Sequence, residues 1–113
     1  MNIENTKAQM RKGVLEMCVL AIISEESIYP SDIIKKLKAA KLIVKEGTLY
    51  PLLTRLKNAS LLTYEWQEST QGGPPRKYYE ITDSGHSFLM ELQENWNQLL
   101  NAVHLTTKNI HQQ

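Results

Sequence analysis

The stretch from Glu46 to Gly85 constrains the fold more than any other part of this chain, because helical and strand patterns follow each other closely in it. It begins with EGTLYPLLTRLKNASLL, continues through the alternating TYEWQ, and ends with GGPPRKYYEITDSG. Leucines at helical spacing predict a helix that starts near Glu46, and alternation predicts strands at 61–67 and 77–82. The turn-forming cluster ESTQGGPP between them predicts a projecting, mobile loop. The stretch is therefore expected to form a helix, a strand, a basic turn, a strand and a new helix start.

The predicted helix from Glu46 separates apolar from polar side chains. Its inner stripe consists of Leu49, Leu52, Leu53 and Leu56. Its other face presents Thr48, Tyr50, Thr54, Arg55, Lys57 and Asn58. Pro51 removes one backbone hydrogen bond and crowds the carbonyl four residues earlier, but that residue is Gly47, near the helix start, so the cost is small. We therefore expect one unbroken helix with an exposed polar face.

Two helices are predicted ahead of this one. Residues 6–24 are apolar almost all round the helix, so more than one side of it needs cover. A chain of 113 residues has few elements for that purpose, which is a first indication of a partner subunit. The second helix is predicted to start near Pro30, a residue favoured in the first turn. Its inner face carries Ile33, Ile34 and Leu37, and its outer face carries Lys35, Lys36, Lys38 and Lys41.

A long helix is predicted from Asp83 to about Thr106, with Thr82 as its cap and a frayed polar tail after it. Its apolar residues recur at intervals of three and four, the spacing of a coiled-coil seam. This seam consists of Leu89, Leu92, Trp96, Leu99 and Val103. We expect it to join two copies of the chain. Together the patterns predict a mostly helical α+β fold.

Charge is divided unevenly along the chain, although the formal net charge is only +1. Residues 35–77 carry nine lysines and arginines against three acids, whereas the remaining residues carry four against nine. Such a division predicts one basic and one acidic surface. A basic run of this kind is often only a solvated face, but here it coincides with the helix and hairpin of the opening pattern.

Several function classes find no support in the sequence. No run reaches the ~20 apolar residues that span a bilayer. Glu16 interrupts the apolar run VLEMCVLAII, which also lacks a cleavage site, so we expect a cytoplasmic protein. Cys18 has apolar neighbours and fits a buried structural thiol better than a redox sensor. His86, His104 and His111 lack the spacing of a metal site. Without a nucleophile–base pair or a phosphate loop, we expect neither an enzyme nor a cofactor.

The order of elements is that of a winged helix-turn-helix, which places one helix in a groove of double-stranded DNA and a basic loop on the backbone beside it. The candidates for the groove are Lys45, Glu46, Thr48, Tyr50, Thr54 and Arg55. Thr48 can donate, accept or touch a thymine methyl, and Arg55 can bind a guanine edge or a phosphate. The loop offers Arg76 and Lys77 to phosphates or the minor groove. The alternatives are ordinary solvated residues on an exposed helix and a solubilising hairpin.

The chain resembles the PadR family of bacterial transcriptional regulators, of the short type with a single C-terminal helix. The resemblance rests on the apolar first helix, GTLYPLLTRLKNASLL, GGPPRKYY-x-IT-x-x-G and a tryptophan in the last helix, and it covers about residues 10–105. It implies a winged helix-turn-helix, a homodimer joined mainly through the last and first helices, operator binding, and often a response to phenolic or drug-like ligands. Tyr29-Pro30-Ser31-Asp32 departs from the family's His-Gly-Tyr-Glu-like helix start, so no role of that aromatic is transferred.

These observations predict a dimeric repressor that binds an inverted-repeat operator and is released by a small aromatic ligand. Residues 1–82 would form the DNA-binding unit, including the first helix, and 83–113 the dimerisation helix and tail, in one compact unit. Trp96, at the centre of the seam, has two interpretations: interface packing, or one of two paired indoles that flank a flat apolar ligand. The rival function is a winged-helix protein–protein module without DNA binding, against which the basic faces argue. The operator, the ligand and the choice between repression and activation stay open at this point.

Overall fold

The computed structural model describes residues 1–69 and 72–110. Within them, four helices and one two-stranded antiparallel sheet confirm the mostly helical α+β class. In chain order the elements are α1 (Ile3–Glu25), α2 (Pro30–Ala39), α3 (Glu46–Asn58), β1 (Leu62–Gln67), β2 (Arg76–Ile81) and α4 (Asp83–Thr107). Part of the loop predicted to be mobile (70–71) and the end of the tail predicted to fray (111–113) lie outside the described residues.

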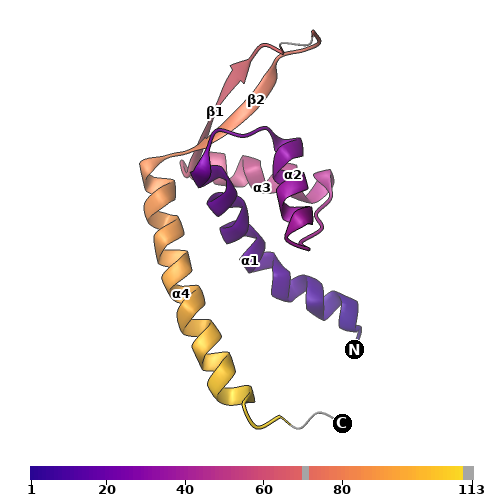
Figure 1. The fold of residues 1–113 in the computed structure, drawn as a ribbon, viewed down its shortest axis with the longest axis vertical. Helices are drawn as coiled ribbons and strands as arrows, with labels where there is room; N and C mark the ends of the chain where they lie inside the picture. Colours follow the sequence, from indigo (N-terminus) through magenta and orange to yellow (C-terminus); the bar gives the residue numbers. More distant parts are fainter. Residues whose placement is uncertain (70–71, 111–113) are drawn as a thin grey trace.

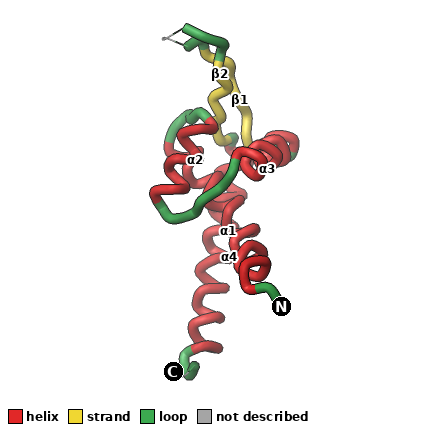
Figure 2. The backbone as a smooth tube through the Cα atoms, turned by 90° about the vertical axis from the view of Figure 1, so that its right-hand side faces the viewer, coloured by secondary structure: helices red, strands yellow, loops and turns green. Residues whose placement is uncertain are grey.

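The elements are arranged along the length of α1 (Figure 1). α2, α3 and the β1–β2 hairpin gather around the C-terminal half of α1, and α4 runs back beside it in the opposite direction. The hairpin projects at one end of the molecule, away from the N-terminus and the C-terminal end of α4 (Figures 1 and 2). α1 and α4 diverge toward the end of the molecule opposite the hairpin. The N-terminal half of α1 and the C-terminal half of α4 therefore have little of their own chain to pack against.

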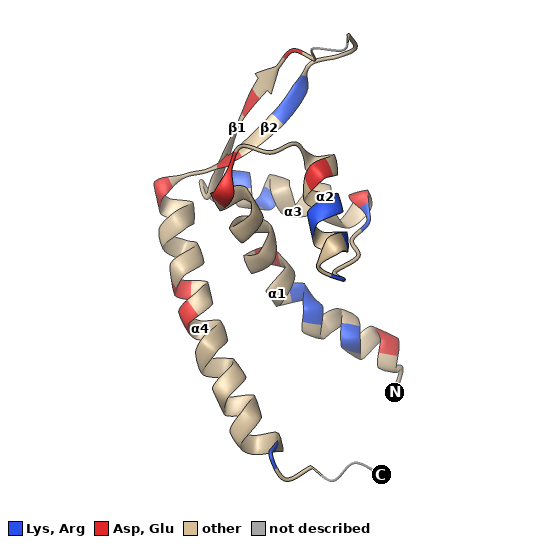
Figure 3. Cartoon of the chain, viewed as in Figure 1, with Lys and Arg blue, Asp and Glu red and all other residues tan. Residues whose placement is uncertain are grey.

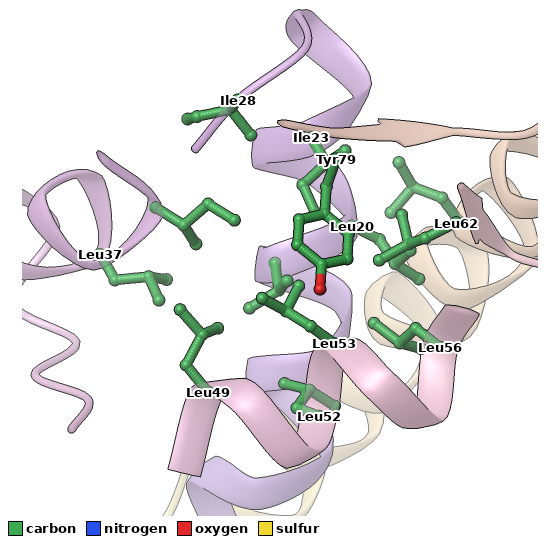
Figure 4. Packing of buried hydrophobic residues seen from close by; sticks show 13 residues of the cluster. Leu20, Ile23, Ile28, Leu37, Leu49, Leu52, Leu53, Leu56, Leu62 and Tyr79 are labelled. Atoms are coloured by element: carbon green, nitrogen blue, oxygen red, sulfur yellow. The ribbon is translucent and has the colours of Figure 1, made fainter. Parts of the chain in front are cut away.

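The core lies where α1, α2, α3 and the hairpin meet. In Figure 4, Leu20 of α1, Leu53 of α3 and Tyr79 of β2 point toward one centre. The whole inner stripe predicted for α3 is buried, which confirms the helical pattern: Leu49, Leu52, Leu53 and Leu56. Apolar burial at ~25 cal/mol per Å2 is the main stabilising contribution here. It holds α3 with its polar face turned outward.

The hairpin has a register that assigns its side chains to two faces. Leu62 pairs with Ile81, Tyr64 with Tyr79 and Trp66 with Lys77, so these six residues share one face. The opposite face carries the pairs Thr63 with Glu80, Glu65 with Tyr78 and Gln67 with Arg76. The connection between α1 and α2 joins the sheet at Ile28, whose N–H donates to the Tyr79 carbonyl (3.1 Å) and whose carbonyl accepts from the Tyr79 N–H (2.9 Å).

Thr82 caps α4, as the sequence predicts, and it also fixes the start of α4 to the turn that follows α3. The Thr82 hydroxyl accepts from the Gly85 N–H (2.9 Å) and donates to the Ser60 carbonyl (2.7 Å). Gly85 is buried against the Leu61 carbonyl, a space that has no room for a Cβ. The capping hydroxyl and the missing side chain together allow α4 to leave the body of the fold at this point.

The prediction for the first helix is wrong at its N-terminus. It places the start at residue 6, but α1 begins at Ile3. The cause is Asn2, whose side-chain oxygen accepts from the N–H groups of Glu4 (2.9 Å) and Asn5 (3.3 Å). An asparagine cap of this kind compensates N–H groups that have no partner within the helix.

Candidate nucleic-acid interface

The outer face of α3 is open to solvent where the sequence predicts a groove-reading surface. Glu46, Thr48, Tyr50 and Thr54 are exposed, and Lys45 is exposed at the position that caps the helix. This set combines hydroxyls, a phenol, a carboxylate and an ammonium group. Such groups supply the donors and acceptors that base edges in a major groove require. Whether each contacts a base stays a prediction.

The phenol of Tyr50 stays protonated on this face. It is 43% exposed, and burial of the rest raises the pKa of its phenol, with further increases from the Glu46 carboxylate and Tyr29. Because the ordinary pKa of tyrosine is already near 10, the phenol stays protonated at neutral pH. Tyr50 can therefore donate a hydrogen bond. The backbone carbonyl of Tyr50 accepts a hydrogen bond from the Thr54 hydroxyl (3.1 Å), which orients the Thr54 side chain.

Arg55 takes a different direction from the other predicted groove residues. Its Nη2 lies 3.4 Å from Oε2 of Glu16 on α1. The side chain is 60% exposed, so the ion pair is only partly shielded from water and contributes little stability by itself. The pair nevertheless links α3 directly to α1. The predicted contact of Arg55 with DNA therefore requires it to share or leave Glu16.

The two basic residues of the hairpin lie on opposite faces. Lys77 Nζ is 4.4 Å from the ring centroid of Tyr64, and Lys57 Nζ of α3 approaches the same ring at 5.8 Å. Arg76 Cζ lies 4.8 Å from the ring of Tyr29, at the start of α2. Cation–π contacts of this kind orient the side chains. Lys77 is thus held on the side of α3, and Arg76 on the side of α2.

Basic side chains also gather outside the hairpin. Besides the blue segment on β2, Figure 3 shows blue segments on α2 and on the N-terminal half of α1, whereas acidic residues mark the first half of α4. On α2, Lys35 pairs with Asp32 (3.8 Å) and Lys36 with Glu26 (3.5 Å). Lys38 forms no ion pair within the described residues. Part of the basic charge of α2 is therefore neutralised by its own chain.

The N-terminal half of α1 is part of this basic region, which sequence analysis missed. Arg11 and Lys12 line a hollow of about 460 Å3 together with Lys45 and Thr48 of the α3 start. The division of charge along the sequence had placed Arg11 and Lys12 in the acidic remainder. The sequence does place Arg11 and Lys12 within two helical turns of Lys7. Their proximity to Lys45, however, depends on how α1 crosses the α2–α3 connection.

The predicted seam of α4 is buried at one end and open at the other. Leu89 is buried in the core of its own chain and Leu92 is half-buried against it. Trp96, Leu99 and Val103 are 36%, 50% and 55% exposed. The apolar surface available to a second copy is therefore the C-terminal half of the seam. Its contact with another chain stays a prediction.

Trp96 also lines a second hollow, of about 390 Å3, between α1 and α4. Its other apolar walls come from both helices: Met10, Val14, Met17, Leu92 and Leu99. The two interpretations of Trp96, packing and ligand contact, both agree with this position. An indole at the edge of an open apolar hollow can contact either a partner helix or a flat ligand.

The described part of the chain shows no reactive thiol and no metal site beside this interface. Burial raises the pKa of the Cys18 thiol on α1, which disfavours the reactive thiolate. In residues 1–69 and 72–110 no three metal-ligating side chains cluster, and His111 lies outside these ranges. No helix of the described part is long and apolar enough to cross a membrane.

Comparison with known proteins identifies what this arrangement resembles. A family model described as the transcriptional regulator PadR-like family matches residues 19–91, from α1 through the first turns of α4. An X-ray structure of a PadR-like transcription factor from Bacteroides fragilis is 61% identical, over 90% of this chain and 98% of that chain, with a TM-score of 0.76.

More distant relatives also match most of the chain. The crystal structure of a PadR family transcriptional regulator from Eggerthella lenta has a TM-score of 0.85 at 31% identity and covers 96% of this chain and 94% of that chain. A protein of Lysinibacillus sphaericus, described as uncharacterized, is 28% identical over 102 residues, 88% of this chain and 93% of that protein. The match therefore extends over nearly the whole length of the chain.

Proposed function

This chain belongs to the PadR-like family of transcriptional regulators, and we propose that it is a homodimeric repressor that binds an inverted-repeat operator in the cytoplasm. Regulation through DNA binding, rather than enzymatic catalysis, follows from the family. The observation that best supports the proposal is the convergence of Lys77 of the hairpin and Lys57 of α3 on one aromatic ring beside the exposed face of α3. A helix and a wing that present cations on the same side can contact a groove and its flanking backbone together.

The residues of α3 would read the operator. We assign base contacts to Thr48 and Tyr50, which lie early in α3 and are exposed. Lys45, Glu46, Thr54 and Arg55 would contact the neighbouring bases or phosphates. Arg76 and Lys77 would neutralise phosphates beside the groove, which raises affinity without selecting sequence. Specificity would then reside in α3 and most of the salt dependence in the wing.

Dimerisation would set the spacing of two such units. Residues 1–82 would read one half-site, and residues 83–113 would join the copies through Trp96, Leu99 and Val103. The α3 helices of the two copies must reach successive major grooves ~34 Å apart, so the operator is expected to be an inverted repeat. Repression follows if the bound dimer overlaps the site used by the polymerase.

Release would come from a flat aromatic ligand in the hollow beside Trp96. A ligand changes DNA affinity only if it binds two dimer geometries with different affinity. Trp96→Ala tests this step. At protein concentrations high enough to keep this variant dimeric, the expected result is operator binding that is no longer lost when the aromatic ligand is added. Unchanged ligand affinity in this variant would leave Trp96 as interface packing only.

The proposal as a whole is tested by duplex binding at several salt concentrations, after selection of bound duplexes from a random pool. Phosphate contacts predict a steep loss of affinity with salt. Thr48→Ala should change the selected consensus, because a good base contact contributes ~1–3 kcal/mol of discrimination. The rival protein–protein module predicts no enriched consensus and no salt-dependent duplex binding. Transcription in vitro from the selected operator then distinguishes repression from activation.

A further inference from the structure

We propose that the hollow between the N-terminal half of α1 and the α2–α3 connection binds a small amphipathic monoanion, an aliphatic chain that ends in one carboxylate. Its volume of about 460 Å3 falls within the ~300–1,000 Å3 typical of small-molecule sites. This hollow and the one beside Trp96 share only Gln9 among their lining residues, so they use different faces of α1. The site is therefore distinct from the one proposed for the aromatic ligand.

The floor of the hollow is apolar. Leu15 of α1 and Leu42 and Val44 of the connection are half-buried there. Ile43, in the middle of the connection, is 78% exposed. Apolar surface that the fold leaves open to water favours an apolar occupant. These residues would hold the aliphatic chain of the ligand.

The rim of the hollow is cationic. Arg11, Lys12 and Lys45 line it, and no acidic residue does. Elsewhere in the described chain, several exposed lysines have an acid beside them, as Lys7 has Glu4 at 3.6 Å. The three rim cations form no ion pair with any described residue. Unpaired cations around an apolar floor select an anion with an apolar body, because each part of such a molecule meets a complementary surface.

The position of the site links it to DNA binding. Lys45 and Thr48 belong to the hollow and also to the face of α3 that we assign to the groove. An occupant that holds Lys45 would compete with DNA for the same ammonium group. This link rests on the proposed function, whereas the binding of the anion does not. Ligand binding and duplex binding are therefore measured separately.

The first experiment titrates the dimer with octanoate and follows backbone amide signals by NMR. The signals of residues 42–48 should shift with octanoate, and octanol and acetate, which lack the charge or the chain, should bind at least ~10-fold more weakly. Arg11→Gln with Lys12→Gln should lower octanoate affinity about 10-fold. The matched control, Lys35→Gln with Lys38→Gln, removes the same charge from α2 outside the hollow and should leave affinity unchanged.

A second variant tests the floor without disturbing the core. Ile43→Ser removes an exposed apolar side chain. It should weaken the binding of octanoate while the fold and the dimer persist. The inference is overturned if octanol binds as well as octanoate, if the Arg11 and Lys12 variant binds like wild type, or if the shifts gather around Trp96.

The link to DNA is then measured as the ratio of duplex affinities with and without octanoate. Octanoate should lower the duplex affinity of the wild type but not that of the Arg11 and Lys12 variant. Octanoate binding at residues 42–48 without any duplex binding would contradict the proposed function and support the site. Duplex binding without octanoate binding would contradict the site and support the function.

Discussion

Gly85 is the residue whose identity the fold restricts most strongly. A Cβ at this position would collide with the Leu61 carbonyl oxygen and lie 2.8 Å from Cγ1 of Ile81. Backbone atoms do not move aside as flexible side chains do. Overpacking in such a place typically destabilises by ~1–3 kcal/mol, and by more when the backbone must shift. The tightness follows from the way α4 starts directly on the turn that ends α3.

We predict that Gly85→Ala lowers the free energy of unfolding by at least ~2 kcal/mol. The measurement is the thermal unfolding midpoint at fixed protein concentration. Gly47→Ala is the control, since a Cβ there meets nothing within 4 Å and alanine is the better helix former. Its midpoint should equal or exceed that of the wild type. A Gly85→Ala midpoint equal to the control would mean that α4 starts differently.

Thr82 gives a second prediction at the residue scale. Its hydroxyl caps α4 at Gly85 and holds the Ser60 carbonyl. Loss of a threonine cap costs ~0.5–2 kcal/mol, so Thr82→Ala should lower the unfolding midpoint. Thr82→Ser keeps the hydroxyl and should retain most of the stability. Equal losses in both variants would attribute the effect to the methyl group rather than to the cap.

At the scale of elements, the hairpin and α3 act together through the rings between them. Tyr64 packs on Tyr79, with ring centroids 5.7 Å apart, and meets Trp66 edge to face at 6.2 Å. Lys57 and Lys77 approach this group from α3 and from β2. The hairpin is thus fixed to α3 at its base, while its outer part projects from the body (Figure 2).

We predict that the two basic residues of the wing contribute unequally to DNA binding. Arg76→Ala with Lys77→Ala should weaken all duplexes similarly and flatten the salt dependence, by ~0.9 in slope for each phosphate that is no longer neutralised. Of the single variants, Lys77→Ala should account for the larger part, because Lys77 lies on the face shared with α3. Equal single effects, or a double variant with the wild-type slope, would argue against this arrangement.

For the whole molecule, the arrangement of α1 and α4 leaves apolar surface without cover from its own chain. Trp96, Leu99 and Val103 lie on this surface, as does Met10 of α1, which is 73% exposed. Burial of such surface is favourable at ~25 cal/mol per Å2. A single chain leaves it exposed to water, and a second copy would remove that exposure.

We therefore predict a homodimer with a dissociation constant below about 1 µM, equivalent to ~8 kcal/mol, measured by sedimentation. Leu99→Glu with Val103→Glu should produce a monomer. Asn97→Glu with Asn101→Glu adds the same charge on the opposite face of α4 and should leave the dimer intact. A wild-type protein that sediments as a monomer well above this concentration would contradict the prediction.

Much of the fold could be predicted from the sequence, because local patterns determine the elements. The leucines of α3 recur at helical spacing and are buried, Pro30 opens α2, and Thr82 caps α4. Each of these signals acts within one or two turns of chain, so it can be read without knowing the neighbours. The start of α1 was missed because a cap by Asn2 leaves no mark in the apolar pattern.

The tertiary structure alone decided which of these faces meet. Period-two alternation separates Arg76 from Lys77, but the packing of the hairpin decides that Lys77 faces α3. The ion pair of Arg55 with Glu16, and the burial of Leu89 in its own core, depend on how α1 crosses α3 and α4. So does the proximity of Arg11 to Lys45. Such contacts join residues far apart in the chain, and the angles between packed helices that create them are properties of the whole core rather than of any segment.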